Sequence, residues 1–503
     1  MDALERGRRE GERLVQAVSR EQYLAYAGLK PGAELRPAYE RHAAAYDDDA
    51  LAGAVEAWRA AAPDGDEGRA ARALAEWIVA TRAGRAVAPL EEREIAWEGS
   101  AVVRTPDGES VPYQRVPIDV ANATDRRERL ALDQARAELV GRELAPMRRE
   151  RLARERDAVL EAGVADGYVA TFEALAGIDV RALGEACGRF LADTQPMWDD
   201  VLSAALRRRL GVARGEATRA DLSALLRAPH FDAGFPGGGM EATIRLQIEA
   251  MGVDPRAGGR VRFDVGEREG KRARAFCAPV RVPEEVHVVL RPRGGQGDWR
   301  AFLHEMGHAL HFAHTRADLP FEFRRLGDAS VTEGYAMLLD HLMHDRGWLR
   351  RYAELSAAQL ADYRRAAALE ELCLLRRYCA KLRYELELYG DGVPWDALPD
   401  LYVESLGAAL GVRHHAADAF VDVDPRFHAA RYLRAWQLQA RLAEALRERF
   451  DEDWYRNPAS GPWLVDELWS EGQRLPAHLL VERLGTAGLD FAPLVRAIEA
   501  RLA

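Results

Sequence analysis

The sequence predicts a mainly α-helical protein of two lobes with a small β-sheet. Apolar residues recur at helical spacing over most of the chain, and from residue 300 to the end the patterns are almost exclusively helical. Only the stretches 94–118 and 273–291 alternate in the way of short strands. At 503 residues the chain exceeds a typical single domain, yet no Pro/Gly/Ser-rich linker divides it. We therefore expect one lobe over residues 1–230 and a second over residues 231–503.

The N-terminal lobe is expected to be helical apart from one hairpin. Breaks at Pro31-Gly32 and Pro63-Asp64-Gly65 separate the helices of the first 90 residues. Over residues 94–118, short alternating runs such as Ile95-Ala96-Trp97 flank a turn at Pro106-Asp107-Gly108, which favours two antiparallel strands. Long charged helices are expected again from about residue 124 to 226, with pairs of opposite charges on their solvent-exposed faces.

The second lobe should begin with short strands and continue as helices. Arg274 to Val280 and Glu285 to Leu290 form two apolar runs, and a glycine-rich segment follows them. A helix is expected to start just after Asp298. The strand that precedes this helix would lie beside it, and its exposed edge could pair with the backbone of an extended peptide.

Composition excludes several classes of protein. The net charge is −11 and no concentrated basic run occurs, which argues against a nucleic-acid partner. No apolar segment resembles a signal peptide or a membrane span, so we expect a cytoplasmic protein without a membrane partner. The cysteines show no paired spacing, so we expect reduced, buried thiols and neither disulfides nor a cysteine metal site. They are Cys187, Cys277, Cys373 and Cys379.

One short motif indicates both a metal and a reaction. In His304-Glu305-Met306-Gly307-His308 the two histidines are four residues apart, so on a helix they point the same way and can hold one zinc ion. The glutamate between such histidines accepts a proton from the water that the metal activates. The motif therefore predicts a hydrolase with one zinc ion per chain, although nitrogen and carboxylate ligands also accept cobalt or manganese.

A third protein ligand is expected, because catalytic zinc normally takes three and keeps one position open. We predict Glu333, which lies 25 residues beyond His308 in a segment that opens a new helix. The rival is His311, but seven residues from His304 correspond to about 10.5 Å along a helix. A supporting or substrate-contacting role suits His311 better. Asp340 could orient a ligand histidine through its other ring nitrogen, or be an ordinary aspartate of the helix surface.

At this point the chain resembles the thimet oligopeptidase and oligopeptidase F family of zinc peptidases. Residues 304–311 look like the zinc helix of that family, and Glu333 falls at its spacing for the third ligand. Residues 268–272 and 275–277 are similar to its upstream segment. The matched stretch runs from about 264 to 340. The resemblance implies a helical body of two lobes around a deep channel that admits short, unfolded peptides.

The resemblance also implies residues that act far downstream of the motif. That family carries a histidine and tyrosines there, and the nearest match is His428 with Tyr432. Tyr432 would donate to the oxyanion that develops in the transition state, with His428 assisting or binding the substrate backbone. The other substrate contacts predicted are His287, His311, Tyr384 and Tyr389.

These observations together predict a zinc metallopeptidase that cleaves short peptides. Two alternatives stay open: a zinc hydrolase dedicated to one biosynthetic peptide or amide, and a homologue that binds peptides without cleaving them. Residues 334–336 differ from those that usually follow the third ligand in the family, and the chain is nearer in length to carboxypeptidase Taq. The sequence therefore leaves open the substrate, endo- or exopeptidase action, and the oligomeric state.

Overall fold

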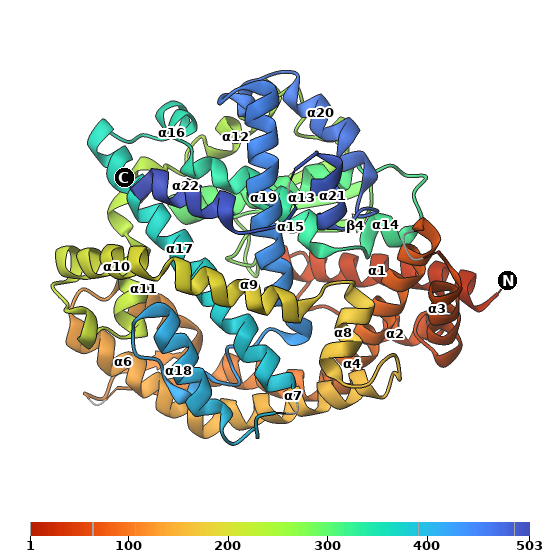
Figure 1. Ribbon diagram of the computed structural model, residues 1–503, viewed down its shortest axis with the longest axis horizontal. Helices are drawn as coiled ribbons and strands as arrows, with labels where there is room; N and C mark the ends of the chain where they lie inside the picture. Colours follow the sequence, from red (N-terminus) through yellow and green to blue (C-terminus); the bar gives the residue numbers. More distant parts are fainter. Residues whose placement is uncertain (1, 63–64, 106, 391, 487, 503) are drawn as a thin grey trace. The chain divides into compact units, whose positions relative to one another are not determined.

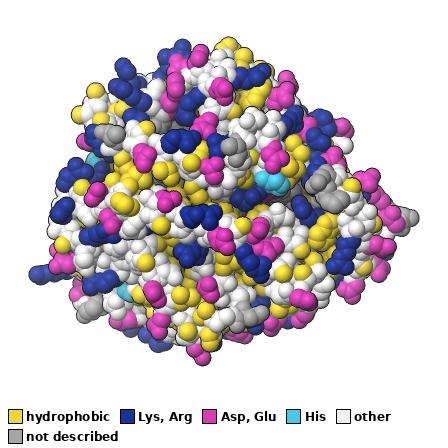
Figure 2. Space-filling model, in the orientation of Figure 1, with side chains coloured by type: hydrophobic (Ala, Val, Ile, Leu, Met, Phe, Trp, Pro, Cys, Tyr) yellow, Lys and Arg dark blue, Asp and Glu magenta, His cyan; other side chains and the backbone are white. Residues whose placement is uncertain are grey.

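The computed structural model is mainly α-helical, as the sequence predicts (Figure 1). It describes residues 2–62, 65–105, 107–390, 392–486 and 488–502. No helix among these residues has the length and apolarity needed to cross a bilayer. The four cysteines are all free, as expected, and three of them are buried. Figure 2 shows acidic and basic side chains interspersed over the visible face, without one dominant basic patch.

The chain divides into two compact units, and each is assembled from three segments. The first unit comprises residues 1–79, 230–364 and 434–494, and the second comprises residues 80–229, 365–433 and 495–503. One boundary coincides with the division expected near residue 230, but the N-terminal 79 residues belong to the unit that contains the motif of residues 304–308. The other boundaries fall inside helices and not in linkers, which is why no linker composition marks them.

The helices of the first unit are α1 (Ala3–Tyr26), α2 (Arg36–Arg41), α3 (Asp48–Ala60), α12 (Met240–Ala250), α13 (Gln296–His314), α14 (Phe321–Arg325), α15 (Ala329–Asp340), α16 (Arg346–Tyr352), α20 (Ser460–Glu467) and α21 (Ala477–Arg483). Those of the second are α5 (Val116–Asn122), α6 (Arg126–Leu139), α7 (Ala145–Leu160), α8 (Tyr168–Ala176), α9 (Val180–Asp193), α10 (Gln195–Leu210), α11 (Arg219–Arg227) and α18 (Leu398–Leu410). Four helices contain a boundary: α4 (Asp66–Ser100), α17 (Ala357–Tyr389), α19 (His428–Phe450) and α22 (Ala492–Leu502).

The first unit contains a three-stranded sheet beside the motif helix. Its strands are β3 (Val261–Asp264), β4 (Phe276–Arg281) and β5 (Glu285–Val289), in the order β3-β5-β4. The two strands predicted over residues 273–291 are present and antiparallel, whereas β3 was not predicted and pairs with β5 in parallel. The strand directly before the motif helix is therefore central. The expectation that it offers an exposed edge is wrong, because the two edge strands are β3 and β4.

The small hairpin of the second unit is shorter than predicted. Strands β1 (Val102–Arg104) and β2 (Ser110–Pro112) pair antiparallel, with Val103 opposite Val111. Ile95-Ala96-Trp97 is not part of it, since α4 continues to Ser100. A pattern of only three residues fits a helix as well as a strand, so it could not show that this segment is helical. In the turn, Gly108 adopts a φ of 92° that favours glycine, and Pro106 lies outside the described residues.

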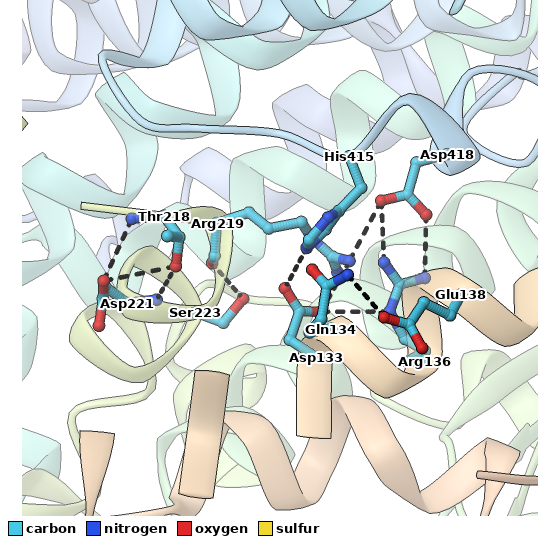
Figure 3. Close-up of polar contacts among 10 residues, drawn as sticks. All are labelled: Asp133, Gln134, Arg136, Glu138, Thr218, Arg219, Asp221, Ser223, His415 and Asp418. Carbon is cyan, nitrogen blue, oxygen red and sulfur yellow. Dashed lines mark hydrogen bonds and ion pairs between the residues drawn. The ribbon is translucent and has the colours of Figure 1, made fainter. Parts of the chain in front are cut away.

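A network of charged side chains joins two of the three segments of the second unit (Figure 3). Arg136 donates two hydrogen bonds of 2.9 Å to Asp418 and one of 3.2 Å to Asp133. Arg219 reaches the same two carboxylates at 3.1 and 3.2 Å, and His415 lies 3.0 Å from Asp133. Burial alone would raise the pKa of Asp133, but His415 and the two arginines outweigh burial and lower it to about 2.

Candidate metal centre

Helices α13 and α15 pack directly against each other in the first unit, and their contact positions the candidate site (Figure 1). Gly307, between the two motif histidines, makes the close approach. A Cβ atom there would lie 2.5 Å from Ala336 Cα and 2.6 Å from the carbonyl oxygen of Tyr335. Only glycine fits this crossing without moving one helix. The crossing brings the first turns of α15 within reach of the motif histidines.

Three donor side chains converge where the helices meet. His304 Nε2 lies 3.4 Å from Glu333 Oε2, and His308 Nε2 lies 3.8 Å from the same oxygen. The ligand atoms of all three residues are within 4.8 Å of one another. A tetrahedral zinc ion with bonds of about 2.0–2.2 Å holds its ligand atoms about 3.3–3.6 Å apart. The structure thus brings together the three predicted ligands at a spacing that fits one metal ion.

Both histidines are held through their other ring nitrogen. Asp340 Oδ2 lies 2.8 Å from His304 Nδ1, and Thr332 Oγ1 lies 2.8 Å from His308 Nδ1. Such partners fix the orientation of the imidazole and leave Nε2 for a metal. The contact considered for Asp340 is therefore present. Thr332 was not predicted, because its segment was interpreted only as the start of a new helix.

The start of α15 explains why Thr332 is available. Asp328 caps the helix by accepting a hydrogen bond of 2.9 Å from the backbone N–H of Ser330. Thr332 then lies inside the first turns, where its hydroxyl is not needed for capping. It is one residue before Glu333, so a single helical turn supplies one ligand and one orienting group.

Glu305 lies at the free edge of β4. Its Oε2 accepts a hydrogen bond of 2.8 Å from the backbone N–H of Cys277. Because this N–H is donated to Glu305, it does not pair with β5 and must point to the other side of the strand. Burial raises the pKa of Glu305 to about 7, although the positive charge of His304 and the hydrogen bond from Cys277 oppose the rise. A carboxylate poised near neutral pH suits a general base.

The electrostatic environments of the two histidines differ. Burial lowers the pKa of His308 to about 4, so its imidazole is neutral at pH 7, as a metal ligand must be. Burial also lowers the pKa of His304. Hydrogen bonds to Asp340 and Glu333 outweigh this effect, so the pKa of His304 is raised. The side chains of the three donors keep 13–23 % of their surface exposed, which leaves the site accessible from solvent.

Two predicted substrate contacts of the first unit are packed in the core. His311 is fully buried and lies edge-on to Tyr335, with ring centroids 4.9 Å apart. It does not belong to the donor group of His304, so the rival set of three histidines is not assembled in the described residues. His287 stacks on Tyr23 at 3.8 Å and is also buried. The structure gives no support to a substrate contact by either histidine.

The predicted downstream residues belong to the second unit. His428 and Tyr432 are half-buried on α19, one turn apart, and their rings meet edge to face with centroids 4.8 Å apart. Their action on the substrate stays a prediction. Tyr384 is buried and donates a hydrogen bond of 2.9 Å to the carbonyl oxygen of Ala419, and the buried Tyr389 stacks on an aromatic neighbour. Both tyrosines have the surroundings of packing residues.

The donor set of two imidazoles and one carboxylate suits zinc, and both imidazoles are oriented for it. Comparison of the chain with protein-family models gave no match, and comparison with curated proteins gave none either.

Proposed function

We propose that the protein is a zinc-dependent metallopeptidase that hydrolyses short peptides. The observation that carries this proposal is the convergence of His304, His308 and Glu333 within 4.8 Å, with Glu305 on the same helix as the two histidines. Two imidazoles and a carboxylate form a frequent ligand set of catalytic zinc in hydrolases. The resemblance of residues 264–340 to the thimet oligopeptidase and oligopeptidase F family supports peptides as the substrate class.

The chain's own residues supply the remaining steps. Zinc at this site would polarise the scissile carbonyl and lower the pKa of water at its open position. Glu305 takes the proton of the attacking water and delivers it to the leaving amine, as a base and then an acid. Asp340 and Thr332 keep the two imidazoles in the orientation that leaves Nε2 free. His428 and Tyr432 are proposed to assist the oxyanion.

The decisive experiment compares the zinc-loaded protein with its Glu305→Gln variant on a diverse library of short peptides. Products are identified by mass spectrometry, and zinc content is measured on the same samples. The amide introduced by Glu305→Gln keeps the shape of the side chain but cannot take a proton. Glu284→Gln, in the turn between β4 and β5 and 46 % exposed, is the matched control.

We expect cleavage by the wild type and by Glu284→Gln, and a loss of at least about a hundredfold in Glu305→Gln, because a positioned general base contributes about 10²–10⁴-fold. The fragments would show whether cleavage is internal or terminal. Intact peptides with every protein, despite bound zinc, would contradict the proposal and favour a dedicated substrate or a binding role.

A further inference from the structure

Arg325, the last residue of α14, is a cation without an ionic partner near the candidate metal centre. No hydrogen bond or ion pair joins it to any residue in the described part of the chain, and its Nε atom is buried. The Arg325 side chain is partly buried, and this burial lowers the pKa of its guanidinium. A charge that is partly removed from water is stabilised by an opposite charge. Arg325 is therefore available to an anion that the folded chain itself does not supply.

The other charged residues of α14 each have an ionic partner, so the lack of one is particular to Arg325. Arg324 donates to Glu12 at 2.8 Å and to two backbone carbonyl oxygens at 2.9 and 3.0 Å. Glu322 accepts a hydrogen bond of 2.5 Å from Arg8 on α1. Both nearby carboxylates are thus already engaged by other arginines. Arg324 thus ties α14 to α1 through Glu12, whereas Arg325, the next residue, has no ionic partner in the described part of the chain.

Two ring contacts connect Arg325 with the metal ligands. Its guanidinium carbon lies 5.5 Å from the centre of the Phe312 ring. Phe312 follows His308 by one turn of α13, and the two rings lie nearly parallel, with centroids 6.4 Å apart. Phe312 is therefore a neighbour of both the guanidinium and a ligand imidazole.

The same guanidinium also lies beside the strand whose backbone holds Glu305. Arg325 lines a small hollow together with Pro279 and Val280 of β4. Figure 1 shows α14 next to β4. Two residues before Pro279 on this strand, the Cys277 N–H holds Glu305. Burial raises the pKa of the Cys277 thiol, and the charge of Arg325 opposes that rise, which agrees with their proximity. A peptide that follows β4 from Glu305 would run toward Arg325.

We infer that Arg325 binds a carboxylate of the peptide substrate, one to three residues from the scissile bond. This inference rests on the proposed peptidase function. An extended chain advances about 3.3–3.6 Å per residue. The two ring contacts therefore place the guanidinium within about three residues of an extended peptide from the His308 imidazole. A guanidinium matches a carboxylate with two parallel hydrogen bonds. The carboxylate is supplied either by the C-terminus of the peptide or by an Asp or Glu side chain.

Binding to the zinc-loaded Glu305→Gln protein tests this without requiring turnover. The probes are peptides of one sequence that end in a carboxylate or a carboxamide, and peptides with Asp or Asn at each of the three positions on either side of the scissile bond. Affinities are measured by calorimetry in this background and after adding Arg325→Gln. Arg316→Gln is the control, because it removes an arginine whose side chain is 49 % exposed.

We expect a carboxylate to bind about 10 to 100 times more tightly than its amide counterpart, as a charge-assisted hydrogen bond would provide. That preference disappears in Arg325→Gln and persists in Arg316→Gln. Preference for the terminal carboxylate would identify a C-terminal exopeptidase, and preference for Asp an enzyme selective for acidic peptides; both support the inference.

Equal binding of both members of every pair, or a preference that survives Arg325→Gln, would overturn it. If Arg325→Gln loses zinc or unfolds, Arg325→Lys decides. A lysine keeps the charge but not the paired hydrogen bonds, so the preference must shrink in this variant. Failure of the proposed function would show separately, as absent cleavage by the wild type.

Discussion

Replacing Gly307 by alanine should disrupt the metal centre through packing alone. The new methyl group would meet Ala336 Cα at 2.5 Å and the Tyr335 carbonyl oxygen at 2.6 Å. Ordinary contact begins near about 3.5 Å, so α13 and α15 would have to separate by about 1 Å. Metal–ligand distances tolerate about 0.2 Å. Since Glu333 is on α15 and both histidines are on α13, the shift removes one ligand from the common sphere.

The expected magnitudes follow from that geometry. Overpacking of a core costs about 1–3 kcal/mol, against a gain of about 0.5–1 kcal/mol when alanine replaces glycine in a helix. We expect Gly307→Ala to be less stable without metal and to bind zinc at least about tenfold more weakly. Gly84→Ala is the control: Gly84 lies inside α4, and a Cβ there meets no atom within 4 Å. This variant should be slightly stabilised and keep its zinc affinity.

The assay is zinc competition with a chromophoric chelator, together with urea unfolding of the metal-free proteins. Zinc affinity of Gly307→Ala equal to that of the wild type would refute the argument that the glycine crossing sets the ligand distances. Loss of affinity in both glycine variants would show that the effect is not specific to the crossing.

Three further outcomes are expected. Asp340→Ala should weaken zinc binding by about 10 to 100 times, measured by the same competition, because His304 loses its orienting partner; unchanged affinity would mean that Asp340 only packs. Thr332→Val should weaken it through His308, whereas Thr332→Ser, which keeps the hydroxyl, should not; equal zinc affinity in both variants would contradict this role. The folded-state pKa of Asp133, about 2, lies below its ordinary 3.8, so its contribution of about 2 kcal/mol is present above about pH 4 and lost as the pH falls toward 2. Asp133→Asn should therefore be less stable in urea at about pH 7 and approach the wild type near about pH 2.5; a constant difference would contradict this.

Periodicity and spacing made the helices and the donor group predictable. The motif histidines share a helix face whatever surrounds them, and the family spacing identified Glu333. Asp340 was considered because it lies seven residues beyond Glu333, and residues seven apart on a helix lie on the same face. The other supporting residues could not be deduced in this way. Thr332 meets His308 only because two helices cross, and local sequence does not encode a crossing.

Other features depend on contacts between distant segments. β3 has four residues and a parallel partner that lies well beyond it in the sequence, so no hairpin signal announces it. Arg324 and Arg325 are indistinguishable in the sequence, yet in the described part of the chain one is tied to Glu12 and the other has no such partner. Gly307 did carry a signal: glycine inside a helix is unfavourable, so its presence between the histidines indicates a close approach.

Titrating zinc into the metal-free protein, while peptide cleavage is followed in the same samples, tests whether this site is a catalytic zinc centre. We predict that cleavage is absent without metal, rises in proportion to added zinc, and reaches its plateau at one zinc ion per chain. The variant Glu333→Gln should not reach that plateau. Cleavage without metal, or one tightly bound zinc ion that produces no cleavage of any peptide, would contradict a zinc peptidase.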